Sequence, residues 1–444
     1  MKTLDQIAAE LQGYDPQALS VEGVSAFLSR LIEPVRGIEQ LALFDALGRV
    51  LAQDLISPID VPPHDNSAMD GFAFASGQLQ ADAPTTLEIA GTALAGKAWQ
   101  GTVGPGQCLK IMTGAVMPMG LDTVAPQEIV TVQGNRISVP PKLLRAGDNR
   151  RFAGEDLKAG EAALAQGELL TPAALGLVAS LGIATVPVMR RLKVAYFSTG
   201  DEILSLGEPP REGAVYDSNR LVVFGLLTRL GIEVHDMGVI RDEPAALEAA
   251  FQAAAAQADA IITSGGVSVG EADHTRSIMK RLGDVVFWRI AMRPGRPMAV
   301  GRISRTKSAN GSSAAVLESY ENSSESDTAI LFGLPGNPVA VMVTFLAFVR
   351  PALLSMMGCT RPEPPLLKAK SAALLRKKPG RTEYQRGLVE RTADGALSVR
   401  AAGNQGSGVL SSMVRANGLI VLHHDQASVK VGEEVDVMMF DGVI

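Results

Sequence analysis

The stretch ADAIITSGGVSVGEADHT, residues 258–275, decides the fold of the largest domain. It begins with a short apolar run, continues into a glycine-rich turn, and leads into polar residues that suit the start of a helix. A buried strand that ends in glycines before a helix is typical of a parallel α/β sheet. The same alternation continues on both sides, so residues 191–360 are expected to form a doubly wound, mostly parallel sheet.

Periodicity gives the elements of this domain. Strands are expected at 232–240 and 284–292, and within 192–202, 258–270 and 328–338, where each strand runs into a turn. The expected helices are 217–231, 242–257, 273–283 and 338–358. Residues 305–327 are rich in serine and lack periodicity, which predicts a flexible insertion that loops out between two strands.

The flanking regions have a different texture. Residues 56–141 and 361–444 show short alternating apolar segments separated by Gly, Pro, Asn and Asp, which predicts a β-rich module and a C-terminal β domain. Residues 1–55 and 142–190 mix helical and strand patterns and are interpreted as one mixed N-terminal and linker module. The chain is therefore expected to be a multidomain α/β protein.

Composition excludes several classes of protein. The 444 residues include 46% hydrophobic and 20% charged residues, which is too apolar for a disordered chain. The net charge of −6 argues against a nucleic-acid partner. Two cysteines, no signal peptide, and a longest apolar run (338–349) shorter than the ~20 residues of a membrane span favour a cytoplasmic protein without a membrane partner.

The glycine-rich turn is the strongest local signal for a binding site. Gly265 and Gly266 allow a tight turn whose N–H groups face an anion, and the hydroxyls of Ser264 and Ser268 add donors. A helix begins just beyond, which favours a phosphate-like ligand. The alternative is an ordinary βα turn in which glycine serves packing.

Acidic residues follow three strands of the same predicted sheet. They are Asp273, Asp242, and either Asp201 or Glu202. Asp242 and Asp273 could each be a helix cap, but three acids at three strand ends exceed what capping requires. The pattern predicts a Mg²⁺ ion that clamps a phosphate ester.

The segment RIAMRPGRP places Arg289, Arg293 and Arg296 close together as the chain leaves a strand of this sheet. Guanidinium groups bind oxyanions in a bidentate manner, so an oxyanion site is expected here. The alternative is a solvated basic turn.

Three further segments carry polar residues outside the sheet. They are PPHDNSAMDGFAF (62–74) with Asp65 and Asp70, RRFAGEDL with Arg151 and Asp156, and QGSGVLSSM with Ser407. Alone, these read equally well as an Asx-rich loop, an exposed ion-paired turn and a hydroxyl-rich turn. The histidines and cysteines show no zinc-ligand spacing, and the sequence contains no Walker A motif, no G-x-S-x-G elbow and no kinase motif set.

Together these segments resemble a known family. DNSAMDGFAF, IMTGA, AGEDL, FSTGDEI, ITSGGVSVGEADHT, RPGRP and LFGLPGNPVAVMVTF, in this order, resemble the MoeA-type molybdenum insertases (molybdopterin molybdotransferases), whose fold also forms the E domain of gephyrin. The resemblance extends from about Val21 to the C-terminus. It implies an elongated homodimer of four-subdomain protomers with a central MogA-like molybdopterin-binding domain.

The resemblance also implies an activity and site residues. Adenylylated molybdopterin and molybdate are the implied substrates, AMP is released in a Mg²⁺-dependent step, and molybdenum is left on the dithiolene. The matching functional positions are Asp70, Thr113, Arg151, Asp156, Glu202, Asp242, Asp273 and Ser407. Glu202, Asp242 and Asp273 are the implied metal ligands. The family often has lysines where this chain has Arg289, Arg293 and Arg296.

Two other functions fit the same fold. One is a gephyrin-like binding or scaffold protein, and the other is a MogA-type molybdopterin adenylyltransferase. The set of acids favours the transferase over the scaffold, and the flanking β modules argue against a MogA-type enzyme. A MogA-type adenylyltransferase and molybdoenzyme delivery proteins are the protein partners that a transferase would meet.

Overall fold

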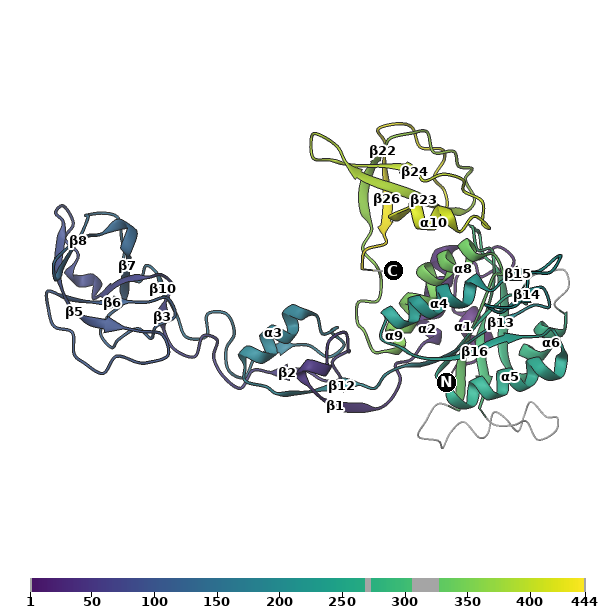
Figure 1. Cartoon of the computed structure of the whole chain (residues 1–444), viewed down its shortest axis with the longest axis horizontal. Helices are drawn as coiled ribbons and strands as arrows, with labels where there is room; N and C mark the ends of the chain where they lie inside the picture. The colour runs from purple at the N-terminus through teal and green to yellow at the C-terminus, as the bar shows by residue number, and fades with distance from the viewer. Residues whose placement is uncertain (1, 268–272, 306–326, 443–444) are drawn as a thin grey trace.

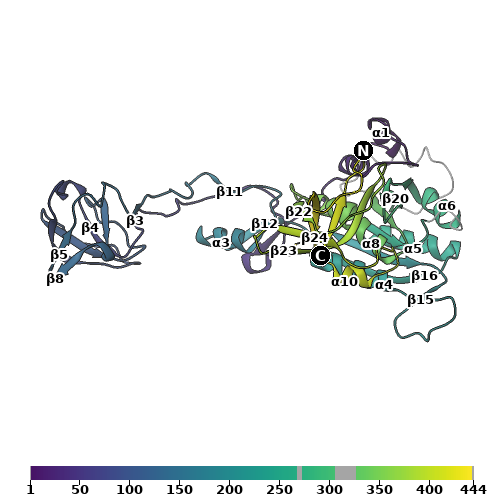
Figure 2. The same cartoon turned by 90° about the horizontal axis from the view of Figure 1, so that it is seen from above.

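The computed structural model describes residues 2–267, 273–305 and 327–442, apart from the side chains of Asp273 and His274. The chain is elongated (Figure 1). A β-rich lobe lies at one end, a small connecting module follows, and the α/β domain lies at the other end with the C-terminal β domain against it (Figures 1 and 2). The expected insertion lies almost wholly outside the described residues.

The α/β domain contains a six-stranded sheet in the order β16-β13-β17-β21-β20-β18. The strands β16 (Glu233–Ile240), β13 (Lys193–Thr199), β17 (Ala260–Ser264) and β21 (Thr328–Leu334) run parallel. The strands β20 (Pro297–Ser304) and β18 (Gly283–Arg289) add an antiparallel edge. The doubly wound, mostly parallel sheet predicted from the sequence is confirmed.

Helices cover both faces of this sheet. On one face, α5 (Pro244–Gln257) and α6 (Asp273–Leu282) pack through residues such as Phe251 and Ile278. On the other face, α4 (Ser218–Arg229) packs beside the long C-terminal helix of the domain. Helices α1 (Leu4–Ala9) and α2 (Val21–Leu31) join this second core through Ile7 and Phe27. The first 31 residues therefore pack with the α/β domain, whereas the sequence pattern had grouped them with 142–190.

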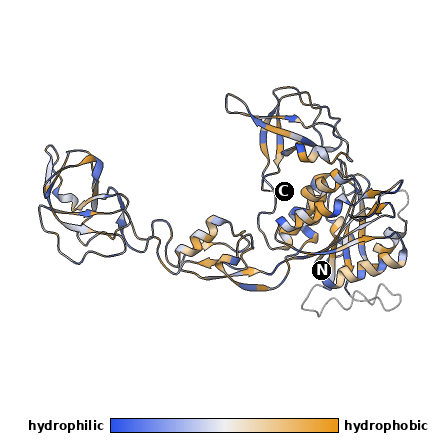
Figure 3. Cartoon of the chain, in the orientation of Figure 1, coloured by the Kyte–Doolittle hydropathy of each residue, from blue (hydrophilic) through white to orange (hydrophobic). Residues whose placement is uncertain are grey.

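The long helix is made of α8 (Pro338–Thr344), a π-helical turn η5 (Phe345–Val349) and α9 (Arg350–Met356). Its 19 residues are apolar enough to span a membrane, longer than the run of twelve read from the sequence. However, 83% of its most apolar window is buried inside the protein. Figure 3 shows this helix as one of the most hydrophobic parts of the domain. It is the core helix of the α/β domain.

The distal lobe is built from β-strands. Its main sheet has the order β7-β4-β6-β5-β9-β8, and β3 (Asn66–Ser67) pairs separately with β10 (Arg150–Arg151). The six strands, in chain order, are β4 (Gly71–Phe74), β5 (Thr85–Ala93), β6 (Gln107–Ile111), β7 (Thr123–Pro126), β8 (Thr131–Gln133) and β9 (Arg136–Val139).

The connecting module is small. Strand β1 (Ile38–Ala42) pairs with β12 (Thr185–Met189), β2 (Leu55–Ile56) pairs with β11 (Ala162–Leu164), and α3 (Pro172–Ser180) packs over them. The chain therefore crosses between this module and the α/β domain twice, once before β1 and once after β12.

The C-terminal domain is a β-barrel. Its strand order is β19-β23-β24-β22-β26-β25, and an additional pairing of β23 with β25 closes it. The strands are β22 (Leu367–Ser371), β23 (Thr382–Arg391), β24 (Leu397–Ala401), β25 (Gly418–Leu422) and β26 (Glu434–Met439). Strand β19 (Met292–Arg293) comes from the α/β part of the chain and pairs with β23. This pairing fixes the arginine-rich turn at the junction of the two domains.

Candidate functional site

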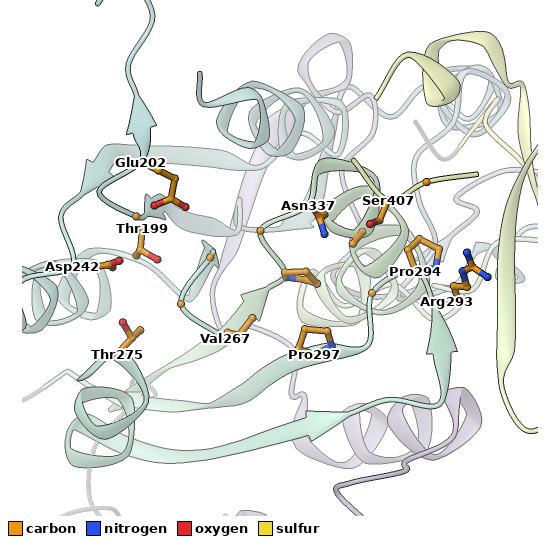
Figure 4. Close-up of a pocket in the computed structure, with 18 of the residues that line it drawn as sticks. Thr199, Glu202, Asp242, Val267, Thr275, Arg293, Pro294, Pro297, Asn337 and Ser407 are labelled. Carbon is orange, nitrogen blue, oxygen red and sulfur yellow. The ribbon is translucent and has the colours of Figure 1, made fainter. Parts of the chain in front are cut away.

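A cavity of about 630 Å³ opens where the parallel strands end (Figure 4). Strands β13, β17 and β21 lead into its lining at Thr199, Gly265 and Pro335. The C-terminal barrel contributes the loop 405–407. Ligands of open α/β sheets bind outside the carboxyl ends of the strands, and this cavity has that position.

The glycine-rich turn lines this cavity. Gly265 and Gly266 have φ angles of +90° and +66°. A Cβ on Gly265 would lie 2.5 Å from the Thr199 carbonyl oxygen, and a Cβ on Gly266 would lie 2.9 Å from Thr275 Cγ2. Only glycine fits both positions. Because the Gly265 N–H already donates to the Leu334 carbonyl (3.2 Å), Gly266 is the better anion donor of the pair.

The two serines expected beside these glycines stand differently. Ser264 is buried below the cavity, where its Oγ hydrogen-bonds with the hydroxyls of Tyr196 (2.7 Å) and Ser198 (3.2 Å). Its side chain therefore supports the turn from beneath, which differs from the expected contact with substrate. Ser268 lies outside the described residues.

Two of the three predicted acids meet in the cavity. Glu202 and Asp242 both line it, near Thr199 (Figure 4). Partial burial of the Asp242 carboxyl, and then the charges of Asp201 and Glu202, raise its pKa. A carboxylate held near two others is stabilised by a cation. Asp273 is the first residue of α6, but its side chain is outside the described part of the chain.

These groups suit a hard divalent cation. Glu202 and Asp242 offer carboxylate oxygens, and the buried Oγ1 of Thr199 has no hydrogen-bond partner among the described residues. Mg²⁺ prefers oxygen ligands and retains several waters, so it is held by one or two carboxylates together with substrate phosphates. Within residues 2–267, 273–305 and 327–442, no group of three or more His, Cys, Asp or Glu forms a complete cation cage. The residues present fit a Mg²⁺ ion that is shared with a ligand.

The three arginines of RIAMRPGRP separate in the structure. Arg293 lines the cavity at the end opposite the acids, beyond Pro294 (Figure 4). Ser407 also lines this end. Arg289 ends β18, and neither it nor the exposed Arg296 lines the cavity. The pairing of β19 with β23 directs Arg293 to the domain junction. Of the three arginines, Arg293 is the one that lines the cavity, and its contact with an oxyanion stays a prediction.

Arg386 was not singled out by the sequence. It lies in β23 and is only 1% exposed. Its guanidinium donates to Ser412 Oγ (3.1 Å) and to the carbonyls of Asn404 (3.2 Å) and Gly406 (3.1 Å). It therefore holds the loop that presents Ser407 to the cavity. Burial, and then the charge of Arg293, lower the pKa of Arg386. The positive charge of these two arginines favours an anion at this end of the cavity.

The remaining predicted residues lie in the distal lobe. The Asp70 carboxylate accepts hydrogen bonds from the Thr113 N–H (2.7 Å) and the Thr113 hydroxyl (2.8 Å). The backbone bond, and then the hydroxyl bond, lower the pKa of Asp70. Arg151 lies in β10 beside Asn66, and Asp156 follows in an exposed loop. The lobe is at the far end of the chain from the cavity in both views (Figures 1 and 2). Within one chain, these residues do not join Glu202 and Asp242.

Three family models match most of the chain. Residues 19–182 match the model of the MoeA N-terminal region (domain I and II). Residues 195–355 match a probable molybdopterin binding domain, and residues 368–440 match the MoeA C-terminal region (domain IV).

Individual relatives give the same result. A molybdopterin molybdenumtransferase of Haemophilus influenzae is 40% identical over 421 residues, covering 95% of this chain and 98% of the relative. One from a Nostoc species is 34% identical and covers 90% and 88%. The crystal structure of the molybdopterin biosynthesis moeA protein from Pyrococcus horikoshii OT3 is 27% identical, with a TM-score of 0.76, and covers 95% of this chain and all of that chain.

Proposed function

The chain belongs to the MoeA family of molybdopterin molybdenumtransferases, and we propose that the cavity at its strand ends is where adenylylated molybdopterin is cleaved. It is a transferase of molybdenum cofactor biosynthesis that inserts molybdenum. The observation that carries the proposal for the site is the meeting of a glycine turn, two acids and an arginine in one cavity. Attack of water on the phosphoanhydride bond there releases AMP and leaves the other phosphate on molybdopterin.

The two ends of the cavity take different parts of the reaction. At one end, the Gly266 N–H binds a phosphate oxygen, and Glu202 and Asp242 would hold Mg²⁺ beside that phosphate. Asp273 is a third ligand by the resemblance alone, because its side chain lies outside the described residues. When bound, Mg²⁺ neutralises charge on the phosphate oxygens and polarises the phosphorus–oxygen bond. The Thr199 hydroxyl, which has no hydrogen-bond partner among the described residues, offers a further oxygen to the Mg²⁺ ion or the phosphate.

The other end of the cavity binds molybdate. Arg293 contacts this oxyanion directly, Ser407 donates a hydroxyl, and Arg386 keeps the Ser407 loop in position. A guanidinium matches a tetrahedral oxyanion with two parallel N–H donors. Since Arg289 and Arg296 do not line the cavity, the proposal assigns the direct contact to Arg293 alone.

The distal lobe completes the site of a second copy. Asp70, Thr113, Arg151 and Asp156 lie far from the cavity of their own chain but are presented on the surface. A two-fold dimer places the lobe of each protomer against the α/β domain of the other. Ligand sites at domain boundaries are common. The protein then acts as a homodimer in the cytoplasm, receiving its substrate from a MogA-type adenylyltransferase and passing its product to delivery proteins.

The overall reaction is tested by incubation of the protein with adenylylated molybdopterin, Mg²⁺ and molybdate. AMP is measured by chromatography, and molybdenum cofactor by reconstitution of a cofactor-free molybdoenzyme. Formation of both products supports the proposal. Formation of cofactor without AMP would contradict the cleavage step.

Replacing Arg293 separates molybdate binding from the rest of the reaction. Arg293→Ala is expected to raise the molybdate concentration needed for half-maximal turnover, because it removes a charge-assisted contact worth ~1.5–3 kcal/mol, about tenfold to a hundredfold in affinity. Arg296→Ala is the matched control, since Arg296 is exposed and outside the cavity lining. An equal effect of both substitutions would show that only general charge matters.

A further inference from the structure

The junction between the connecting module and the α/β domain contains a buried carboxylate, that of Asp259. This residue lies just before β17 and is 9% exposed. Its backbone N–H donates to the Lys193 carbonyl (2.8 Å), and its carbonyl accepts from Ile330 N–H (3.0 Å), so the sheet fixes its position.

The Asp259 carboxylate reaches out of the sheet to the arm, defined here as the connecting module and the distal lobe together (residues 38–189). Its two oxygens accept from both terminal nitrogens of Arg190, each at 2.8 Å. Arg190 follows directly after β12, where the chain returns from the arm. A bidentate ion pair has a defined geometry as well as a favourable energy, so it fixes the direction of the returning strand.

Arg190 also holds the outgoing crossing of the chain. Its Nε donates to the Arg36 carbonyl (2.8 Å), and its backbone N–H donates to the Gly37 carbonyl (3.0 Å). The side chain packs across Gly37, where a Cβ would lie 3.0 Å from Arg190 Cδ and φ is +118°. One guanidinium therefore ties both chain crossings to one carboxylate of the α/β sheet.

A second, separate contact braces the arm from another side. The Thr360 N–H donates to the Gly167 carbonyl (3.1 Å), and a Cβ on Gly167 would lie 2.4 Å from Thr360 Cγ2. Gly167 belongs to the connecting module, and Thr360 follows the long helix of the α/β domain. If only the two chain crossings joined the arm to the α/β domain, the arm could rotate about them as about a hinge. The Asp259–Arg190 ion pair and the Gly167–Thr360 contact lie at different places, so together they oppose this rotation.

We propose that Asp259 is a positioning residue that sets the angle of the arm through Arg190. The inference rests on the proposed function in one respect, because the arm must carry Asp70 into the cavity of the partner. An error of ~1 Å in the placement of reacting groups can lower turnover about a hundredfold. Asp259 lies just before β17, where hydrogen bonds to the sheet fix its position. The α/β domain supplies one half of the shared cleft, and through Asp259 it also sets the direction of the arm that carries the other half.

The arm angle is measured directly as a distance between two spin labels in the full-length protein. Labels are introduced by Gln133→Cys in β8 and Lys280→Cys in α6, both exposed, in a Cys359→Ser background, since Cys108 is buried. Labelled chains are diluted with an excess of unlabelled chains, so that nearly every labelled dimer carries one pair of labels. The native protein is expected to give one narrow distance distribution. Asp259→Asn is expected to widen or shift it and to lower turnover with unchanged substrate KM.

Two further variants distinguish loss of the Asp259–Arg190 ion pair from general destabilisation of the protein. Arg190→Gln removes the same ion pair from the arm side, where the side chain is 29% exposed. Asp236→Asn is the matched control, because Asp236 pairs with Arg220 Nε (2.8 and 2.9 Å) inside the α/β domain without reaching the arm. Asp236→Asn is expected to leave the distance distribution unchanged.

The readouts separate the two ideas. An unchanged distribution in both Asp259→Asn and Arg190→Gln would overturn the positioning role, whatever happens to turnover. A wider distance distribution with full turnover would confirm that Asp259 sets the arm angle. The same result would contradict the proposal that the cleft is shared between protomers.

Discussion

Asp242→Asn is expected to lower turnover about a hundredfold or more, without lowering the free energy of unfolding of the protein. A neutral amide is a poor ligand for Mg²⁺, so the variant loses a charge that faces the phosphate. Folding raises the pKa of the Asp242 carboxyl. The folded state therefore binds this proton more tightly than the unfolded state, and the ionised carboxylate costs stability as the pH rises through its titration range. Asparagine carries no charge at any pH and avoids this cost.

Thermal unfolding with and without Mg²⁺ checks both halves of this expectation. The Tm of Asp242→Asn in the absence of Mg²⁺ should equal or exceed that of the native protein. Mg²⁺ added together with AMP, which supplies a phosphate, should raise the Tm of the native protein more than AMP alone, since ligands of the folded state stabilise it, and should have less effect on the variant. Asp236→Asn again serves as the control. A variant that unfolds earlier, or that keeps its response to Mg²⁺, would contradict the assignment of Asp242 as a ligand.

The sheet and part of the site could be predicted because their signals are local. A short apolar strand, a glycine turn and a helix follow one another within 258–275, and this order occurs only in a few architectures. Parallel strands bring their carboxyl ends to one edge, so Glu202, Asp242 and Gly265 converge although they are far apart in sequence.

The remaining contacts depend on pairings that no local pattern encodes. Arg386 is a single arginine in an alternating strand, and it becomes important only because β23 pairs with β19 beside the cavity. The same pairing selects Arg293 over Arg289 and Arg296, which the sequence could not distinguish. The amphipathic pattern of α2 predicts that one face of the helix is buried, but it does not say which domain covers that face. Only the structure shows that α2 packs on the core of the α/β domain. Ser407 stands in a segment that reads equally well as an ordinary hydroxyl-rich turn, and only the resemblance to the family gave it a functional role.

Co-expression of two inactive variants is expected to restore activity, and this result would place the cleft between protomers. In a heterodimer of Asp70→Asn with Asp242→Asn, one shared cleft carries both substitutions and the other carries neither. A purified heterodimer should therefore recover about half of the native turnover, because a two-fold dimer has two equivalent clefts. If each cleft belonged to a single chain, both clefts would carry one substitution and no activity would return. The Asn at position 70 can still accept the bond from Thr113 N–H, so the lobe should keep its structure.

The control is a heterodimer of Asp242→Asn with Glu202→Gln. Both residues line the same cavity, so each cleft loses one acid in either arrangement and no recovery is expected. Two differently tagged chains and tandem affinity purification isolate the heterodimers, and AMP release measures their turnover. The distance between the lobe and the cavity within one chain is what makes the shared arrangement the expected one (Figure 1).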